Sequence, residues 1–435
     1  MPCVDAAAMT DGTARSSPLR STFESVKADL PLALLLAALI AVGVLLRVHL
    51  LGVPVNLKWD EVHYVETARA YVAHQFRWDD HPPLGKLIMA GVMAIVGDTP
   101  VGWRLAPLLF GLANIGLVAW SARTAFKSSR AAWIAAAFVA ADGFFIAYSR
   151  SALLDGMIVA FSVAATTLIL RATRPWHVLA TGVLAGCAVS CKLNGLACVG
   201  VTTLICLFSP RLRRWTPLLL VTVILVFYAQ GALGLRIAGR SGSVLAVIAD
   251  NRAKIGKHLS YTVVHAYSSR WYTWFLPLRP IPLRRDVDPD GSIRALIALG
   301  NPLLWWSSSA AVIAAAAMAI RNGLRPLWRE IVGGTGLARG SSATLFWMLA
   351  AWAAPLAFWI PSLRDAYLYH YLPSYAFALA LLAGFVSQLY ERHRLAALIA
   401  IAFALEVTIF YAPISGELPI TLDALNARLL FKFWQ

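Results

Sequence analysis

The sequence predicts an all-α membrane protein that crosses the bilayer many times. Of its 435 residues, 59% are hydrophobic and only 14% are charged, and the mean hydropathy is +0.67. Soluble domains are typically about half apolar and about one quarter charged. The composition therefore excludes an ordinary soluble enzyme and a disordered chain. Apolar stretches near the length that spans a bilayer, about 20 residues, recur along the chain.

Eleven of these stretches are predicted to be membrane spans. In chain order they are 30–46, 103–120, 131–148, 153–170, 178–193, 196–208, 216–235, 295–320, 345–360, 373–389 and 395–411. The two short stretches, 178–193 and 196–208, are expected to bend about Asn194-Gly195. Arg47 follows the first stretch where a signal peptide would carry a small-residue cleavage site, so this stretch is expected to be an uncleaved anchor.

The charge distribution predicts the orientation. The formal net charge of +16 comes from 38 Lys and Arg against 22 Asp and Glu. In a soluble chain this excess would suggest a nucleic-acid partner, but none is expected here, because the positive-inside rule can absorb much of the excess and the remainder is free to meet anionic lipid. The basic residues lie in alternate connections: Arg123, Lys127, Arg130, Arg171, Arg174, Arg211, Arg213, Arg214, Arg321, Arg325, Arg329, Arg392 and Arg394. The pattern predicts a cytoplasmic tail (1–29), a transmembrane domain (30–411) and an external tail (412–435).

Two long loops, 47–102 and 236–294, are then expected on the outer side. Neither is long enough for a soluble domain of ordinary size. The first loop is expected to have no fold of its own. The chain shows no internal repeat of the inverted kind that is common in secondary transporters.

Carboxylates are scarce, so their positions are informative. Asp60 and Glu61 lie in the first outer loop, followed by the run 79–86, Asp-Asp-His-Pro-Pro-Leu-Gly-Lys. Asp142 lies inside the third predicted span, and Asp155 begins the fourth from the outer side. Alone, such residues are usually a solvated surface pair, a rigid turn or a complement to a helix dipole. Together, in order and near one membrane face, they indicate a site.

These motifs resemble the protein O-mannosyltransferases, a family of the glycosyltransferase C superfamily of membrane enzymes. The first matches are Asp60-Glu61 after the first span and the His-Pro-Pro-Leu-Gly-Lys run that ends at Lys86. The later matches are Trp103-Arg104-Leu105, Asp142-Gly143, Ser149-Arg150, Leu153-Leu154-Asp155, Cys191-Lys192-Leu193-Asn194-Gly195, Tyr267-Ser268-Ser269-Arg270-Trp271-Tyr272-Thr273-Trp274, Arg279-Pro280, Leu299-Gly300-Asn301-Pro302-Leu303-Leu304-Trp305 and Tyr369-His370-Tyr371-Leu372-Pro373. The resemblance covers about 59–373 and implies a glycosyltransferase C fold with about eleven transmembrane helices.

Two features depart from the family pattern. The eukaryotic enzymes carry a β-trefoil domain in the late outer loop, whereas 236–294 is too short to hold one. The chain is therefore more similar to the bacterial members, which leaves the choice of acceptor open and implies a bacterial plasma membrane. Asp80 stands where the family usually has an apolar residue, which adds a charge near the site.

The resemblance implies inverting transfer of mannose from a polyprenyl (dolichyl-type) phosphate-mannose donor. The acceptors would be Ser or Thr hydroxyls of exported proteins at the outer face. The implied partners are the lipid donor, the protein acceptor and the surrounding bilayer, and an association with secretion machinery is a further expectation. Mannose rests on the resemblance alone.

Each site residue suits a step of this reaction. A hydroxyl is a weak nucleophile near neutral pH and needs a base, for which Asp60 is the candidate. The other catalytic candidates are Glu61, which would orient or bind the acceptor, and Asp155. The cations expected at the donor phosphate are Lys86, Arg104, Arg150, Lys192 and Arg270, because negative charge develops on the leaving phosphate. His63, Asp79 and His81 are expected to position the acceptor or the loop.

No cofactor is expected. A divalent metal is the alternative, because oxygen and imidazole donors lie close together in the first outer loop. Those donors are Asp60, Glu61, His63, Asp79 and His81. Their spacing is not diagnostic, and a lipid monophosphate leaving group carries less charge than a nucleotide diphosphate.

Three other functions stay open. A polyprenyl-phosphate-sugar transferase acting on a glycolipid or polysaccharide would have an acceptor cavity open to the bilayer. A transporter or flippase would place polar residues near the middle of the membrane in paired, broken helices. A structural subunit would not need an intact Asp60-Glu61 pair or Asp155. If these residues form a single site, we expect one cavity at the outer face that is open sideways to lipid. It would be lined by the Asp60-Glu61 and His-Pro-Pro motifs of the first loop, by Arg104 and by Asp155.

Overall fold

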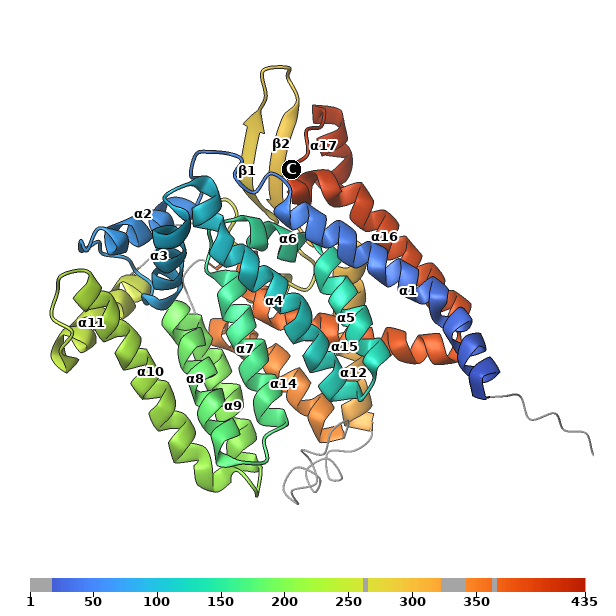
Figure 1. The fold of residues 1–435 in the computed structure, drawn as a ribbon, viewed down its shortest axis with the longest axis horizontal. Helices are drawn as coiled ribbons and strands as arrows, with labels where there is room; N and C mark the ends of the chain where they lie inside the picture. Colours follow the sequence, from blue (N-terminus) through green and yellow to red (C-terminus); the bar gives the residue numbers. More distant parts are fainter. Residues whose placement is uncertain (1–17, 261–264, 322–341, 362–365, 435) are drawn as a thin grey trace, which may run out of the picture.

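The fold is a helical bundle with a small β-hairpin at one end (Figure 1). The computed structural model describes residues 18–260, 265–321, 342–361 and 366–434. The helices that coincide with predicted spans are α1 (Pro18–Val48), α4 (Pro100–Phe126), α5 (Ser129–Ala141), α6 (Gly143–Arg150), α7 (Asp155–Leu170), α8 (Pro175–Cys191), α9 (Leu196–Phe208), α10 (Thr216–Ile237), α12 (Pro302–Arg321), α14 (Ser342–Trp359), α15 (Leu372–Arg392) and α16 (Arg394–Gly416).

Within the described residues, six helices are long and apolar enough to cross a membrane, or seven if the bent pair α5–α6 is one span. α7, α8, α9 and α14 are shorter apolar helices. The chain is therefore an integral membrane protein of the predicted all-α class, and eleven as the number of spans stays a prediction. α15 lies at the centre of the bundle, with most of its side chains buried. Arg325 and Arg329 lie outside the described residues.

The expected bend between the two short spans is confirmed. A 3-10 turn, η1 (Leu193–Gly195), joins α8 to α9. A Cβ atom on Gly195 would lie 2.4 Å from the backbone of Ala188, so only glycine lets the turn pack against α8. The bend places Lys192, the C-cap residue of α8, at one end of the bundle.

Two predicted spans differ from the structure. Residues 131–148 are not one helix, because α5 and α6 meet at 60° about Asp142. Asp142 Oδ1 accepts the N–H groups of Phe144 and Phe145 at 3.0 and 3.2 Å, so this buried carboxylate caps α6. The span predicted from residue 295 begins at Pro302, because Ile293–Ala298 form a strand. A short apolar run does not distinguish a buried strand from a helix.

The long loops are more ordered than expected. The first loop contains α2 (Glu61–Val72) and α3 (Leu84–Val96), so the expectation that it has no fold of its own was wrong. The second contains α11 (Val244–Ser260), η3 (Trp271–Thr273) and β1 (Ile281–Val287), which pairs antiparallel with β2 (Ile293–Ala298). The remaining short elements are η2 (Arg213–Trp215), η4 (Leu368–Tyr371), α17 (Leu422–Arg428) and η5 (Lys432–Trp434).

The hairpin, α17, α2 and α3 gather at the upper end of the bundle in Figure 1, opposite the α9–α10 turn. Ile420, in the predicted C-terminal tail, exchanges backbone hydrogen bonds with Ile293 at the start of β2. The C-terminal segment is therefore tied to the hairpin. Elements from the beginning, middle and end of the chain thus meet at one end.

Candidate active site

The Asp60-Glu61 motif lies at the start of α2, with Glu61 as its first helical residue. Glu61 is buried, and Arg104 of α4 contacts both of its carboxylate oxygens, Nε to Oε1 at 3.0 Å and Nη2 to Oε2 at 3.2 Å. Oε1 also accepts the backbone N–H of Ala152 at 2.9 Å. This bidentate pair fixes the start of α2 against α4.

Two residues that the sequence analysis missed complete this network. Arg284 of β1 lies 3.6 Å from Glu61 Oε1, and its Nε lies 2.8 Å from Glu417 Oε1. Arg150 donates to the other Glu417 oxygen at 3.2 Å. All five side chains are buried. The signal that could have found Glu417 is the rarity of carboxylates in this chain, since Glu417 directly follows an apolar stretch.

The network affects the pKa of Glu61. Burial alone raises the pKa of its carboxyl, but Arg284 and Arg104 outweigh burial and bring the pKa below its ordinary value. Burial lowers the pKa of Arg284 to about 10, which still leaves the guanidinium charged at neutral pH. Glu61 is therefore an ionised anchor in this arrangement.

Asp155 and Lys192 form a second buried pair. Lys192 Nζ donates to both oxygens of Asp155, each at 3.0 Å. The ammonium also lies over the rings of Tyr369 and Tyr64, 4.9 and 5.6 Å from the centroids. Aromatic faces attract a cation when water is excluded. Lys192 is thus a buried cation held by contacts on several sides.

Asp60 shares the electrostatic environment of this pair. Burial raises the pKa of the Asp60 carboxyl, Lys192 and His63 act to lower it, and Asp155 and Asp80 act to raise it. The net result is a pKa above the ordinary value. A carboxylate with a raised pKa is a stronger base than an ordinary Asp, as proton abstraction from a hydroxyl requires.

A cavity of about 620 Å³ adjoins Lys192. The walls are mostly apolar or aromatic with a few polar groups, which is typical of a ligand-binding site. It is lined by His81, Lys192, Leu193, Asn194, Leu196, Ile255, His258, Leu259, Phe358, Trp359, Pro361, Tyr369 and His370. His81 and Lys192 come from the predicted motifs. The Asp60-Glu61 motif, Arg104 and Asp155 were also expected in the lining and are not part of it.

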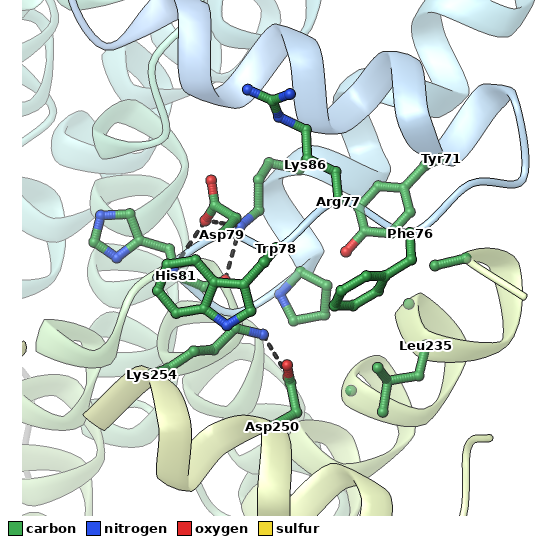
Figure 2. A pocket seen from close by; sticks show the side chains of 14 residues that line it. Tyr71, Phe76, Arg77, Trp78, Asp79, His81, Lys86, Leu235, Asp250 and Lys254 are labelled. Carbon is green, nitrogen blue, oxygen red and sulfur yellow. Dashed lines mark hydrogen bonds and ion pairs between the residues drawn. The ribbon is translucent and has the colours of Figure 1, made fainter. Parts of the chain in front are cut away.

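The His-Pro-Pro run is held by a third ion pair. Lys86 of α3 pairs with Asp79 and also donates to the carbonyl of His81 at 2.7 Å. Figure 2 shows this pair beside a second one, Lys254 with Asp250 of α11. The pocket between them, about 20 Å³, has room for a water molecule rather than a sugar. The Lys86–Asp79 pair therefore ties the start of α3 to the segment that directly precedes it.

The remaining predicted residues lie apart. His63 is exposed on α2, and Arg270 is exposed just before η3. Arg150 Nη1 donates to the carbonyls of Leu46 and His49 at 2.5 and 2.6 Å, which ties the end of α1 to α6. Of the predicted residues, His81 and Lys192 line the cavity, Asp155 pairs with Lys192, and Asp60 shares the electrostatic environment of that pair. Glu61, Arg104 and Arg150 belong to the buried network with Arg284 and Glu417.

No three His, Cys, Asp or Glu side chains within the described ranges gather as a metal site. The carboxylates of Glu61, Asp79 and Asp155 already form ion pairs with Arg or Lys side chains. A metal bound by one of these three carboxylates would compete with its Arg or Lys partner.

The sequence matches three family models in succession. Two are described as dolichyl-phosphate-mannose-protein mannosyltransferase, at residues 37–103 and 80–230. The third, the C-terminal four-TMM region of protein-O-mannosyltransferase, matches residues 246–434. The chain belongs to the protein O-mannosyltransferase family. The resemblance of the motifs is therefore confirmed, and almost all of the described chain lies inside a matched region.

Individual relatives are distant. The polyprenol-phosphate-mannose–protein mannosyltransferase of Mycolicibacterium smegmatis is 25% identical over 337 residues, which cover 58% of this chain and 64% of that protein. The dolichyl-phosphate-mannose–protein mannosyltransferase 2 of Candida albicans is 27% identical over 210 residues, 40% of this chain. The match spans 27% of the fungal protein's length.

Solved structures share the fold. A chain of the S. cerevisiae protein O-mannosyltransferase Pmt1-Pmt2 complex bound to the sugar donor superposes with a TM-score of 0.78 at 14% identity, covering 93% of this chain and 92% of that one. ArnT from Cupriavidus metallidurans gives a TM-score of 0.57 at 19% identity, covering 89% and 65%. The glycosyltransferase C fold is therefore confirmed.

Proposed function

We propose that this chain transfers mannose from a polyprenyl phosphate-mannose donor to Ser or Thr hydroxyls of exported proteins. The observation that carries the proposal is the cavity at Lys192. Its apolar wall suits a polyprenyl chain, its buried cation suits the phosphate, and Asp60, with its raised pKa, shares the electrostatic environment of that cation. Family membership supports the choice of mannose and of protein.

The proposed reaction is a single displacement. The acceptor oxygen attacks the anomeric carbon, Asp60 takes the hydroxyl proton, and the bond from the anomeric carbon to the phosphate oxygen breaks. Lys192 stabilises the charge that develops on the departing polyprenyl phosphate. One displacement inverts the anomeric configuration and needs no carboxylate nucleophile. Glu61 is a positioning residue. It directly follows Asp60 in the chain, and its pairing with Arg104 and Arg284 fixes the backbone that carries Asp60.

We further propose that the site faces the outside of a bacterial plasma membrane, with the N-terminus in the cytoplasm. The chemistry supports this side, because exported proteins and the sugar of the lipid donor meet there. No cofactor is included in the proposed reaction. An association with secretion machinery is part of the proposal and would be tested by crosslinking in cells.

The test is reconstitution. Purified protein in lipid nanodiscs is given polyprenyl phosphate with labelled mannose and a Ser/Thr-containing peptide, and mass spectrometry follows the peptide. The expected result is a mass gain of one hexose on a Ser or Thr of the peptide. Labelled glycolipid without labelled peptide would support the glycolipid alternative, and unreacted donor with every acceptor would contradict transfer.

A further inference from the structure

α11 begins shortly after α10, one of the six helices long enough to cross a membrane. Its inner face packs on the protein: Val247 packs close to Gly231 of α10, and His258 bonds to the carbonyl of Asp80 at 2.9 Å. α11 therefore begins close to the end of a helix that is long and apolar enough to cross a membrane.

The outer face of α11 is an exposed apolar stripe. Leu245, Ile248, Ile255 and Leu259 are 79%, 58%, 46% and 82% exposed. At 3.6 residues per turn these four side chains fall within an arc of about 80°. Large apolar side chains gathered on one exposed helix face mark a contact with lipid or protein.

The charges on α11 favour lipid. Arg252 and Lys257 are exposed, whereas the single acidic residue of the helix, Asp250, is paired with Lys254. An exposed apolar stripe on a helix whose exposed charges are basic is typical of an interfacial helix on an anionic bilayer. Arg252 falls within the same arc as the stripe, and its long side chain can extend its charge to the headgroups.

α11 also borders the cavity. Ile255, His258 and Leu259 belong to its lining, and the ring of His258 stacks on His81 at 5.2 Å. The same two apolar residues, Ile255 and Leu259, are therefore part of both the exposed stripe and the cavity wall.

We propose that α11 lies in the membrane interface with its stripe in the acyl layer of the outer leaflet, and that it forms the lipid-side rim of the cavity. The occupant of the stripe is bilayer lipid with anionic headgroups. A lipid ligand then enters sideways, past the C-terminal turn of α11. The location of the helix does not depend on the proposed function, whereas the route of a donor does.

The location is tested with a fluorescent probe on single cysteines in nanodiscs of anionic lipid. Ile248→Cys and Leu259→Cys report the stripe, and Ala253→Cys, exposed on another face of α11, is the matched control. Wild-type protein is the labelling blank. Lipids brominated on the acyl chains should quench the probes at 248 and 259 at least twofold more than the probe at 253, and aqueous iodide should show the reverse order. Equal quenching at all three positions, or iodide access at 248 and 259, would overturn the proposal. Probes at 248 and 259 that neither brominated lipid nor iodide quenches would also overturn the proposal, because they would indicate a protein partner on the stripe.

The route is tested by donor chain length. Leu259→Asn should raise the apparent KM for a long-chain polyprenyl donor several-fold more than the apparent KM for a short, water-dispersed donor. Equal effects on both donors would exclude the rim as the route. If wild-type protein uses neither donor, the proposed function fails, while the quenching result still decides where α11 lies.

Discussion

Lys192 Nζ lies 3.0 Å from both carboxylate oxygens of Asp155, and these two residues belong to different helices. Both side chains are largely removed from water, since each is 5% exposed. Burying one charge alone costs several kcal/mol, at least about 3–5 when its partner is removed. The pair thus lets the chain keep a cation beside an apolar cavity.

Removal of the Lys192 cation should impair donor use. Lys192→Met is expected to lower kcat/KM for the donor by roughly 10²–10³, as for other groups that stabilise developing charge. The KM for acceptor peptide should stay within about twofold. Lys127→Met, at the C-cap of α4, is the control and should behave as wild type. An unchanged donor kcat/KM in folded Lys192→Met would remove the residue from the mechanism.

Asp60→Asn should abolish most of the transfer while the protein still folds and inserts. The loss of a proton acceptor is expected to cost about 10²–10⁴ in kcat. Single-turnover assays with purified protein measure it, and Asp423→Asn, exposed near the C-terminus, is the matched control. Near-normal turnover by Asp60→Asn would exclude Asp60 as the base.

The pH profile should follow the neighbours of Asp60. A base works in its ionised form, so activity is present above the pKa of Asp60 and is lost as pH falls through it. Asp155 raises this pKa and His63 lowers it. Asp155→Asn should therefore move the acid limb of kcat/KM to lower pH, and His63→Gln should move it to higher pH. An acid limb of kcat/KM that does not move in these variants, or that moves in the opposite direction, would contradict the assignment of Asp60 as the base.

Substitution of Arg284 should lower the stability of the protein, because this side chain belongs to the buried ion-pair network. Arg284→Met leaves Glu417 with only Arg150 and removes one partner of Glu61, which should cost about 3–5 kcal/mol. Thermal unfolding in detergent measures the loss. Arg285→Met, the exposed neighbour on β1, should melt as wild type does.

Coupling within that network gives a sharper readout. Arg284→Met combined with Glu417→Gln should destabilise less than the sum of the single changes, because residues in one network are not additive. Additive losses would show that the two side chains act independently.

The proposed orientation, with a cytoplasmic N-terminus, predicts where reporter fusions are active. A fusion after Arg171 should report the cytoplasm, whereas fusions within 236–294 and at the C-terminal residue should report the outside. A cytoplasmic C-terminus would mean that one span is miscounted, with the short pair α8–α9 the first to examine.

Local sequence features predicted much of the fold. Apolar stretches identified helices because a bilayer accepts only segments that satisfy their own backbone hydrogen bonds. The bend at Asn194-Gly195 was predictable because that dipeptide interrupts an apolar run. Asp142 was not predicted to break its helix, because its capping role depends on a bent path that composition does not encode.

The motif order alone brought Asp60, Asp155 and Lys192 into one hypothesis, and the tertiary structure decided which charge pairs with which. Arg104 was expected at the donor phosphate and lies against Glu61, while Arg284 and Glu417 join the same network from segments far apart in the chain. Periodicity and composition act over a few residues, so they determine where helices form. Ion-pair partners depend on how distant elements pack, because a buried charge pairs with whichever opposite charge the fold brings within a few ångströms.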